Sequence, residues 1–493
     1  MYSPLPGNIH LGALCKYLVI SGIFLTFFYI VLFDTTHHHY QPSDLLETFK
    51  QKCSNIPLTI NTSSTTPPPP DHSPPPTNIS HIVFGVIGSM NTWRHKRLYS
   101  QAWWRPNVTR GYVFLDRAPT NEFLPLFSSS PPFRVNENIT MREIYPKLAS
   151  PIQIRMVRTS LETFREGDEN VRWYVIADDD TVLMVDNLVE ILKKYDHTKY
   201  YYIGTNSESL NSDFGLSFDM AFGGAAYVLS YPVAKMIAST LDSCIERYPG
   251  IGYSDLMMYT CLTDLGVAIT HNKGFHQIDL RGDISGLLSA HPQTPFISLH
   301  HLDTIDPIFP RMNRPESINH LMKAAKVDQS RVLQQNMCHH RATNWSLSVA
   351  WGYSAQIYEA ILPRSFLRKP LETFRPWSGG RPPYLLNPRW RTNNPCEAPH
   401  VFFFHSVSKE PSTREEGDHG VITTYVRASS RGLASCSPSG NHSADHIDTI
   451  RVFSPAKLPL EAGRRECCDV VYAAGMNTTE VRYRACTNEE VTA

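Results

Sequence analysis

A short apolar segment that runs directly into three aspartates limits the folds open to this chain. Trp173–Ala177 reads WYVIA, and Asp178, Asp179 and Asp180 follow without a spacer. A continuous apolar run of this length is typical of a strand that is buried on both faces of a sheet. The segment therefore favours an α/β fold, in which ligands bind beyond the carboxyl ends of the strands.

Further apolar runs repeat this strand signal and alternate with helical patterns. We expect other strands at 81–87, 111–115, 200–203 and 225–229, and helices at 93–104, 150–172, 188–195 and 256–265 and from 231. Strands that alternate with helices imply an α/β domain with a largely buried sheet. After residue 310 aromatic stretches alternate with Pro, Gly and Arg clusters, and we expect 311–493 to be a mainly β appended region.

The N-terminal segment predicts a membrane anchor. Tyr17–Phe33 is mostly apolar and as a helix would reach roughly 25 Å, enough for a thin bilayer. A cleaved signal peptide is the alternative, but no small-residue cleavage site follows the run. We expect a cytosolic tail at 1–16, a single type II transmembrane helix at 17–33 and a proline-rich stem at 34–80.

Charge and glycosylation signals bear on partners and compartment. The chain has 46 basic and 46 acidic residues without a long basic block, which argues against a nucleic-acid partner. Seven Asn-x-Ser/Thr triplets follow the apolar run: Asn61, Asn78, Asn107, Asn138, Asn344, Asn441 and Asn477. They agree with a lumenal body, where cysteines can pair. Cys244 and Cys261 would then either form a bridge or remain two buried thiols.

Four groups of residues could carry chemistry. Asp178 and Asp180 would project to one side of an extended chain and suit a hard divalent cation, although a polar turn with a helix cap is equally open. The other three are the paired glycines Gly223 and Gly224, the loop carboxylate Asp255, and the adjacent His300 and His301. By themselves these could be a structural turn, a helix cap and hydrogen-bonding histidines. They could also be a substrate contact, a general base and metal ligands.

Taken in order, four motifs resemble the Fringe-like glycosyltransferases, and most closely the plant Fringe-related branch of glycosyltransferase family 31. The motifs are WYVIADDDT, AFGGAAYVLSYP, YPGIGYSD and ISLHHLDTIDPIFP. They lie within about residues 80–310, and RPW at 375–377 and the pair Cys467-Cys468 are similar to that branch's C-terminal region.

The resemblance implies a fold, a reaction and a role for each candidate residue. It implies a GT-A nucleotide-sugar fold over residues 81–310, a manganese ion, a UDP-sugar donor, a glycan or glycoconjugate acceptor, inversion at the anomeric carbon and a Golgi location. Asp180 would bind the metal with His300 as the distal ligand, and His301 stays open as an alternative. Asp255 would be the general base, and the nucleotide sugar would contact Asp178, Asp179, Asp116, Gly223 and Gly224.

Two positions depart from the family pattern. Leu256 stands where a second acidic residue usually follows the base, and Ala226 replaces the last glycine of Gly-Gly-Ala-Gly. A catalytically weakened lumenal binding or scaffold protein is therefore the main competing hypothesis. A metal-dependent hydrolase would share the carboxylate and histidine site but would not explain the order of the motifs.

Overall fold

The computed structural model describes residues 75–124, 127–139, 147–291, 294–380, 382–409, 420–455, 466–473, 475–487 and 490. They belong to one compact unit, 75–493. The expected tail, the anchor at 17–33 and most of the stem lie outside the described residues. Among the helices that are described, none has the length and apolar character needed to cross a membrane.

The first sheet is mixed and, counted over the described residues, has seven strands in the order β3-β2-β1-β4-β7-β6-β8. Neighbouring strands from β3 to β4 are parallel, and β7 runs antiparallel to both β4 and β6. The strands are β1 (Ile82–Ile87), β2 (Arg110–Leu115), β3 (Phe133–Val135), β4 (Trp173–Asp178), β6 (Tyr202–Gly204), β7 (Tyr227–Ser230) and β8 (Ile269–His271). The α/β prediction is confirmed, and the mixed sheet fits a GT-A-like fold.

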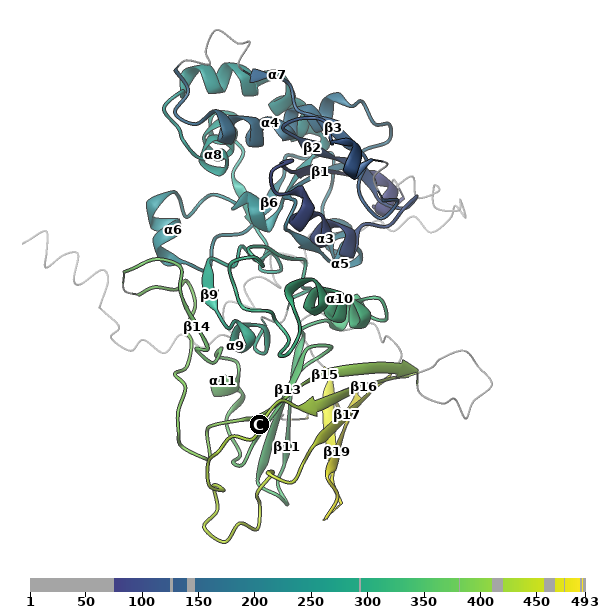
Figure 1. Ribbon diagram of the computed structural model, residues 1–493, viewed down its shortest axis with the longest axis vertical. Helices are drawn as coiled ribbons and strands as arrows, with labels where there is room; N and C mark the ends of the chain where they lie inside the picture. Colours follow the sequence, from purple (N-terminus) through teal and green to yellow (C-terminus); the bar gives the residue numbers. More distant parts are fainter. Residues whose placement is uncertain are drawn as a thin grey trace, which may run out of the picture. The chain divides into compact units, whose positions relative to one another are not determined.

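Helices cover both faces of this sheet (Figure 1). One face packs against α4 (Pro151–Arg165), α7 (Tyr231–Arg247) and α8 (Ser254–Asp264), and the other against α3 (Trp93–Trp103) and α5 (Val185–Leu192). The two-sided cover explains why β1 and β4 are apolar without alternation.

The helix expected at 150–172 ends earlier than predicted. It stops at Arg165, and Gly167 follows with φ +74°. Glycine in this left-handed conformation commonly ends a helix, because it has no Cβ to clash.

The second sheet, within the described residues, has eight strands in the order β11-β12-β13-β15-β16-β17-β19-β18. The strands are β11 (Gln335–His340), β12 (Trp345–Ala350), β13 (Ser354–Tyr358), β15 (His400–Lys409), β16 (Val421–Arg427), β17 (Thr449–Ser454), β18 (Cys467–Val471) and β19 (Thr478–Arg484). Its first and last strands, β11 and β18, lie next to each other and are joined by the disulfide Cys338–Cys468. The sheet therefore curves until its two edges meet.

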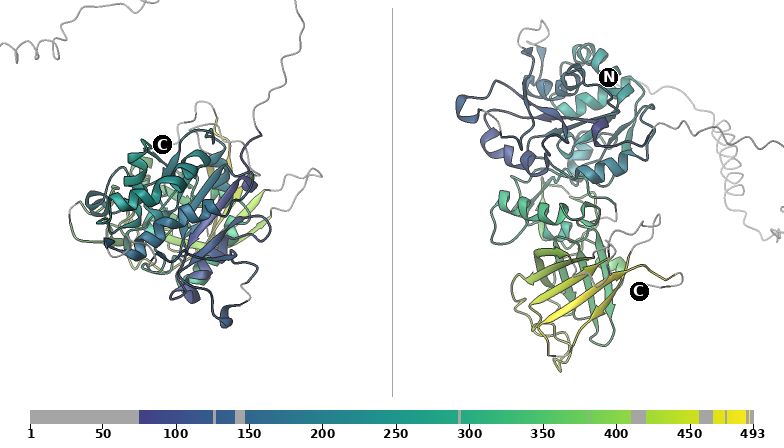
Figure 2. Two further views of the ribbon diagram at one scale, coloured as in Figure 1. Left: turned by 90° about the horizontal axis from the view of Figure 1, so that it is seen from above. Right: turned by 90° about the vertical axis from the view of Figure 1, so that its right-hand side faces the viewer.

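Helix α10 (Arg314–Ala325) connects the two sheets (Figure 2). It contacts α3 on one side and β15 on the other, and one apolar core extends from β1 to β19. The shorter elements are β5 (Val182–Leu183), α6 (Leu210–Gly215), β9 (Leu280–Gly282), α9 (Ser285–Leu288), β10 (Ser298–Leu299), α11 (Arg364–Leu367) and β14 (Phe374–Pro376). Single 3₁₀ turns occur at Ile79–His81, Asn121–Phe123, Gly223–Ala225 and Gln329–Arg331.

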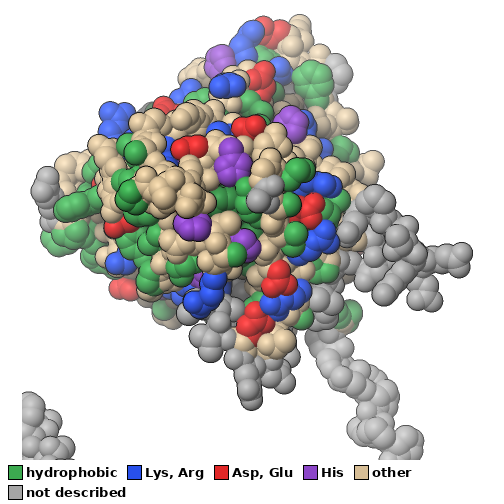
Figure 3. All heavy atoms as spheres, turned by 90° about the horizontal axis from the view of Figure 1, so that it is seen from below, with side chains coloured by type: hydrophobic (Ala, Val, Ile, Leu, Met, Phe, Trp, Pro, Cys, Tyr) green, Lys and Arg blue, Asp and Glu red, His purple; other side chains and the backbone are tan. Residues whose placement is uncertain are grey.

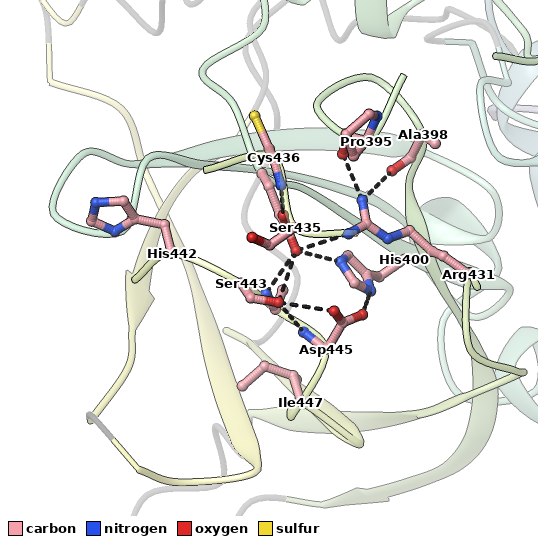
Figure 4. A network of polar contacts seen from close by, with 12 residues as sticks. Pro395, Ala398, His400, Arg431, Ser435, Cys436, His442, Ser443, Asp445 and Ile447 are labelled. Atoms are coloured by element: carbon pink, nitrogen blue, oxygen red, sulfur yellow. Dashed lines mark hydrogen bonds and ion pairs between the residues drawn. The ribbon is translucent and has the colours of Figure 1, made fainter. Parts of the chain in front are cut away.

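A buried carboxylate, Glu359, organises the loops beside the second sheet, and its partners His400, Arg431 and Cys436 are labelled in Figure 4. It accepts hydrogen bonds from His400 Nε2 at 2.8 Å, Arg431 Nη2 at 3.0 Å, and the backbone N–H groups of Cys436 at 2.6 Å and Ala444 at 2.9 Å. Burial opposes its charge, but these donors lower the pKa of Glu359 to about 2. Because both carboxylate oxygens accept hydrogen bonds, the group is structural, although Glu359, His400 and Asp445 lie close enough to one another to hold a metal ion.

Charged side chains on the visible face of Figure 3 are interspersed, and neither sign gathers into an extended patch. This agrees with the balanced composition and gives no electrostatic footprint for a polyanion on that face.

Candidate functional site

The three aspartates lie at the carboxyl end of the central strands of the first sheet. Asp178 is the last residue of β4 and pairs with Ile87 at the end of β1. The backbone N–H of Asp179 donates to the Ile87 carbonyl oxygen at 2.9 Å. Ligands bind at such strand ends in α/β folds, so the carboxylates stand where this architecture places a site.

Pairing of two short strands brings a histidine to these carboxylates. β10 runs antiparallel to β5, with Leu299 opposite Val182, so His300 emerges beside the aspartates. Its Nε2 lies 3.2 Å from Asp180 Oδ1 and 3.5 Å from Asp178 Oδ2. The structure thus brings together three of the residues that the sequence singled out.

His301 points elsewhere. Its Nδ1 lies 3.0 Å from Asp279 Oδ1, and its ring stacks on Trp377. Of the two adjacent histidines, His300 is therefore the one that joins Asp178 and Asp180.

Lys96 of α3 is a member of the cluster that the sequence reasoning missed. Its Nζ lies 2.9 Å from Asp180 Oδ2 and 3.6 Å from Asp179 Oδ1. No motif indicated it, because a lysine in a helical stretch normally lies on a solvated face. It partly neutralises the carboxylates and holds Asp180 in place.

The pKa values of Asp179, Asp180 and His300 shift in different directions, because the three groups are buried close together. Burial raises the pKa of Asp179 to about 8, although Lys96 opposes the shift. Burial also opposes the charge of Asp180, but the charge and hydrogen bonding of His300, aided by Lys96, lower its pKa. Burial favours the neutral form of His300, yet Asp180 and Asp178 raise its pKa to about 10. A metal ion bound by the Nε2 of His300 would displace its proton.

Gly223 and Gly224 let the backbone lie close to the side chains of Asp255 and His300. A Cβ on Gly224 would lie 2.1 Å from His300 Cε1, and one on Gly223 would lie 2.5 Å from Asp255 Oδ1. The two positions therefore exclude any side chain for a reason other than turn formation.

Ala226, the departure from the motif, has φ +73° and ψ 149°, a backbone region that glycine adopts most easily. Its side chain is fully buried in the core and does not line the cavity described below. Its methyl group therefore does not narrow the cavity. Its cost is backbone strain.

Asp255 lies in the first turn of α8, and its carboxylate accepts a hydrogen bond from the Gly223 backbone. The residue before α8 is Tyr253, so Asp255 is not the residue that caps the helix. Burial raises the pKa of Asp255 to about 6, and the charge of Asp178 acts in the same direction. A carboxyl group with such a pKa suits a general base near neutral pH.

A disulfide between Cys244 of α7 and Cys261 of α8 closes the segment that includes Asp255. Of the two alternatives for this cysteine pair, the structure has the bridge. It is one of four disulfides among the described residues, with Cys338–Cys468, Cys396–Cys436 and Cys467–Cys486.

These groups share a cavity of about 570 Å³. Its wall includes Asp178, Gly223, Gly224, Asp255 and His300, with Asp180 buried behind His300. Tyr253 and His301, close in the sequence to Asp255 and His300, also line it, and Trp377 and Ser378 complete it from the late region.

Besides Asp180, three positions singled out in the sequence do not line this cavity: Leu256, Asp179 and Asp116. Leu256 is absent from the described lining, so the second departure from the motif does not alter its wall. Asp179 faces Lys96, and Asp116 accepts hydrogen bonds from the Met90 backbone at 2.7 Å and Arg117 at 2.6 Å.

The residues present fit a divalent cation. Ligand atoms of Asp178, Asp180 and His300 all lie within 4.8 Å of one another. Asp180 Oδ1 is buried, and its neighbour at 3.2 Å, His300 Nε2, is itself one of these ligand atoms. Two carboxylates and an imidazole are donors that Mn²⁺ accepts.

A mixed α/β sheet with carboxylates and a histidine at its carboxyl edge defines a candidate cation-binding site, and sequence comparison indicates the class of protein. Residues 100–293 match the model of the Fringe-like family. Residues 212–468, just over half of the chain, match the family described as protein of unknown function, DUF604, and the chain belongs to this family.

Two curated relatives each match about 30% of the chain. A beta-1,3-glucosyltransferase of Mus musculus is 31% identical over 152 residues, which are 30% of this chain and 29% of that protein. The beta-1,3-glucosyltransferase of Homo sapiens is 28% identical over 149 residues, 30% of this chain and 28% of that protein. The chain thus spans less than a third of the length of these relatives. The matches support a glycosyltransferase of Fringe-like type.

Two solved structures are more distant. Glycosyltransferase GlyE of Streptococcus pneumoniae TIGR4, in its apo form, has 12% identity and a TM-score of 0.26, covering 40% of this chain and 45% of its own. Mouse xyloside xylosyltransferase 1, also apo, has 8% identity and a TM-score of 0.26, covering 38% and 84%. A TM-score of this size does not define a shared fold.

Proposed function

We propose that the chain is an inverting glycosyltransferase that moves a sugar from a UDP-sugar donor to a hydroxyl group of a glycan or glycoconjugate. The observation that carries this proposal is the shared cavity. It holds a partly buried carboxylate, Asp255, together with Asp178 and His300 of a cation-binding cluster. Displacement at an anomeric carbon needs both a base for the acceptor and a counter-charge for the leaving diphosphate.

Each group has a defined task in this proposal. Asp178, Asp180 and His300 would hold Mn²⁺, which when bound neutralises charge on the diphosphate. Asp255 accepts the proton of the attacking hydroxyl. Lys96 keeps Asp180 ionised and oriented, because its ammonium lies 2.9 Å from that carboxylate. Gly223 and Gly224 leave room for Asp255 and His300 at the cavity wall.

Linkage and lineage belong to the same proposal. We infer a β-1,3 linkage, supported by the printed names of the mouse and human relatives. Membership of the plant Fringe-related branch is supported by the RPW motif at 375–377 and by Cys467-Cys468.

We also propose that the protein is a single-pass type II membrane protein of the Golgi with a lumenal catalytic unit. The apolar run at 17–33 and the seven glycosylation triplets support this location. The four disulfides of the described residues agree with an oxidising compartment. N-terminal sequencing of the mature chain tests it, since a start beyond Phe33 would contradict an uncleaved anchor.

The decisive test measures UDP release by the purified full chain across UDP-sugars and acceptors, with and without Mn²⁺. We expect release to depend on the metal and to fall at least about 100-fold in Asp180→Ala, since a metal ligand is lost. Asp186→Ala is the matched control. Asp186 is an exposed aspartate paired with Arg105, and its loss should leave the rate unchanged.

The competing scaffold hypothesis predicts Mn²⁺-dependent UDP binding without turnover on any acceptor. The two departures from the family pattern do not favour this hypothesis, because Leu256 does not line the described cavity and Ala226 lies in the core.

A further inference from the structure

The C-terminal region contributes an aromatic residue to the cavity of the first sheet. β14 pairs antiparallel with β9, with Arg375 opposite Arg281 and Pro376 opposite Leu280. Trp377 follows directly and its ring stacks on His301, with ring centroids 4.7 Å apart and planes 9° from parallel. This contact joins a late segment, beyond residue 310, to the histidine pair.

The ring of His301 also packs against the ring of His300, the candidate metal ligand. The rings of His301 and His300 have centroids 3.9 Å apart and are inclined by 32°. Consecutive side chains in an extended chain point to opposite sides. His301 instead has φ +54°, which breaks the alternation and lets the two rings lie against each other. A non-glycine residue in this conformation is uncommon, and strain of this kind is retained where surrounding contacts fix it.

His300 lacks the usual second support of a metal-binding histidine. Such histidines generally donate their other ring N–H to a carboxylate, a carbonyl group or water. His300 Nδ1 is buried and has no hydrogen-bond partner among the described residues. Its ring is instead confined by the Gly224 backbone and by the ring of His301.

His301 is itself well fixed. Its Nδ1 lies 3.0 Å from Asp279 Oδ1, and Asp279 Oδ2 accepts a hydrogen bond from Ser207 at 2.6 Å. Trp377 holds the ring, and the guanidinium carbon of Arg281 lies 4.4 Å from the centroid of Trp377. Arg281 also donates to the Trp377 carbonyl oxygen at 3.3 Å.

We propose that Trp377 is a positioning residue for the cation site: by stacking on His301 it holds the ring of His300 so that Nε2 faces Asp178 and Asp180. This inference rests on the proposed function, because it requires that the cluster binds a divalent cation. It gives the late segment at 374–377 a role in the chemistry of the first sheet. The role acts through His301 and needs no contact between Trp377 and the ion.

Direct Mn²⁺ titration of the purified full chain, read by the signal of free Mn²⁺ and without donor or acceptor, tests the proposal. Supports of metal-binding histidines are typically worth about 10- to 100-fold in metal affinity. We expect Trp377→Leu, which keeps apolar bulk but removes the ring, to weaken Mn²⁺ binding by about that factor. Trp377→Phe retains a stacking ring and should recover most of the affinity.

The control is Trp390→Leu, another tryptophan of the late region, 82% exposed and outside the cavity lining. It should bind Mn²⁺ as the unmodified chain does. Thermal unfolding of each variant without metal separates positioning from general destabilisation. If Trp377→Leu and Trp377→Phe bind Mn²⁺ equally, or if Trp377→Leu binds like the unmodified chain, the inference is overturned.

A failure of the proposed function would give a different result in the Mn²⁺ titration. If the unmodified chain does not bind Mn²⁺ in the titration, or binds it as well after Asp180→Ala, the cation site itself is wrong. A chain that binds Mn²⁺ through Asp180 but is insensitive to Trp377 overturns only the role of Trp377.

Discussion

At the scale of single residues, Asp255 is the group on which the proposed chemistry depends most. Its carboxylate is hydrogen-bonded by the Gly223 backbone, and burial raises its pKa to about 6. It is thus ionised at neutral pH while remaining basic enough to accept a proton.

We predict that kcat/KM rises with pH through an apparent pKa at or below about 6 and is constant at higher pH. The apparent pKa can lie below 6 because a bound cation adds positive charge that favours the carboxylate. Asp255→Asn should lower turnover by about 10²- to 10⁴-fold and leave UDP binding nearly unchanged. Steady-state kinetics across pH check both expectations. Asp264→Asn, an exposed aspartate on the same helix, should behave as the unmodified chain. An unchanged rate in Asp255→Asn would remove the base from the mechanism.

Ala226 allows a test of strain separate from activity. Its φ of +73° costs about 1–3 kcal/mol in a non-glycine residue. Its neighbour Ala225 is as deeply buried but does not have a positive φ. We predict that Ala226→Gly is more stable than Ala225→Gly by about 1–3 kcal/mol, because both lose a buried methyl group and only the first relieves strain. Urea unfolding of the two variants measures the difference, and equal stabilities would show that Ala226 is unstrained.

At the scale of elements, the disulfide between α7 and α8 closes the segment that carries Asp255 at the cavity. Cys244 and Cys261 are 17 residues apart, and both are buried in the core on one face of the first sheet. A link of this size stabilises by about 3 kcal/mol in the chain-entropy model. The disulfide also restricts where the linked segment can lie, and this segment includes Tyr253 and Asp255, which line the cavity.

Removing this link by Cys244→Ala with Cys261→Ala should lower the free energy of unfolding by about 2–4 kcal/mol and also lower kcat. The matched control is removal of Cys396–Cys436, which lies beside Glu359 and away from the cavity. That pair should cost similar stability and leave kcat unchanged. Equal kinetic effects of the two removals would mean that the α7–α8 link has no special role in holding Asp255.

At the scale of the whole molecule, the sequence predicted what depends on local pattern. The apolar runs of β1 and β4 and the helical spacing of α4 and α7 identify these elements, because the first sheet is buried on both faces. Contacts between segments that are distant in the sequence produce no local sequence pattern and were not predicted. Lys96 meets Asp180 through packing of α3, and Trp377 reaches His301 only through the β14–β9 pairing.

The second sheet shows the same limit. Cys467 and Cys468 are adjacent, but a strand directs neighbouring side chains to opposite faces. Cys467 pairs with Cys486 near its own strand pair, whereas Cys468 reaches across to Cys338 of β11. The sequence shows the pair and the resemblance it carries. The curvature of the sheet, which brings β11 beside β18, determines that Cys468 and not Cys467 forms the bridge to Cys338.

Glu359 gives a test of stability that belongs to the unit as a whole. Its pKa is lowered from 4.5 to about 2 in the folded chain. The unfolded chain therefore takes up this proton first as pH falls, and stability is lost between about pH 4.5 and pH 2. The shift corresponds to about 3 kcal/mol, which is fully present above about pH 5.

We predict that Glu359→Gln lowers the free energy of unfolding at pH 7 by about 3–5 kcal/mol, because donors from His400, Arg431 and two backbone groups lose a charged acceptor. The variant should also lose part of the acid-induced decrease in stability between about pH 4.5 and pH 2. Chemical unfolding across pH measures both effects. Glu190→Gln, an exposed residue paired with Lys193, should stay within about 0.5 kcal/mol of the unmodified chain and keep its pH slope. If Glu359→Gln keeps the full slope, the buried carboxylate is not the group that couples the second sheet to pH.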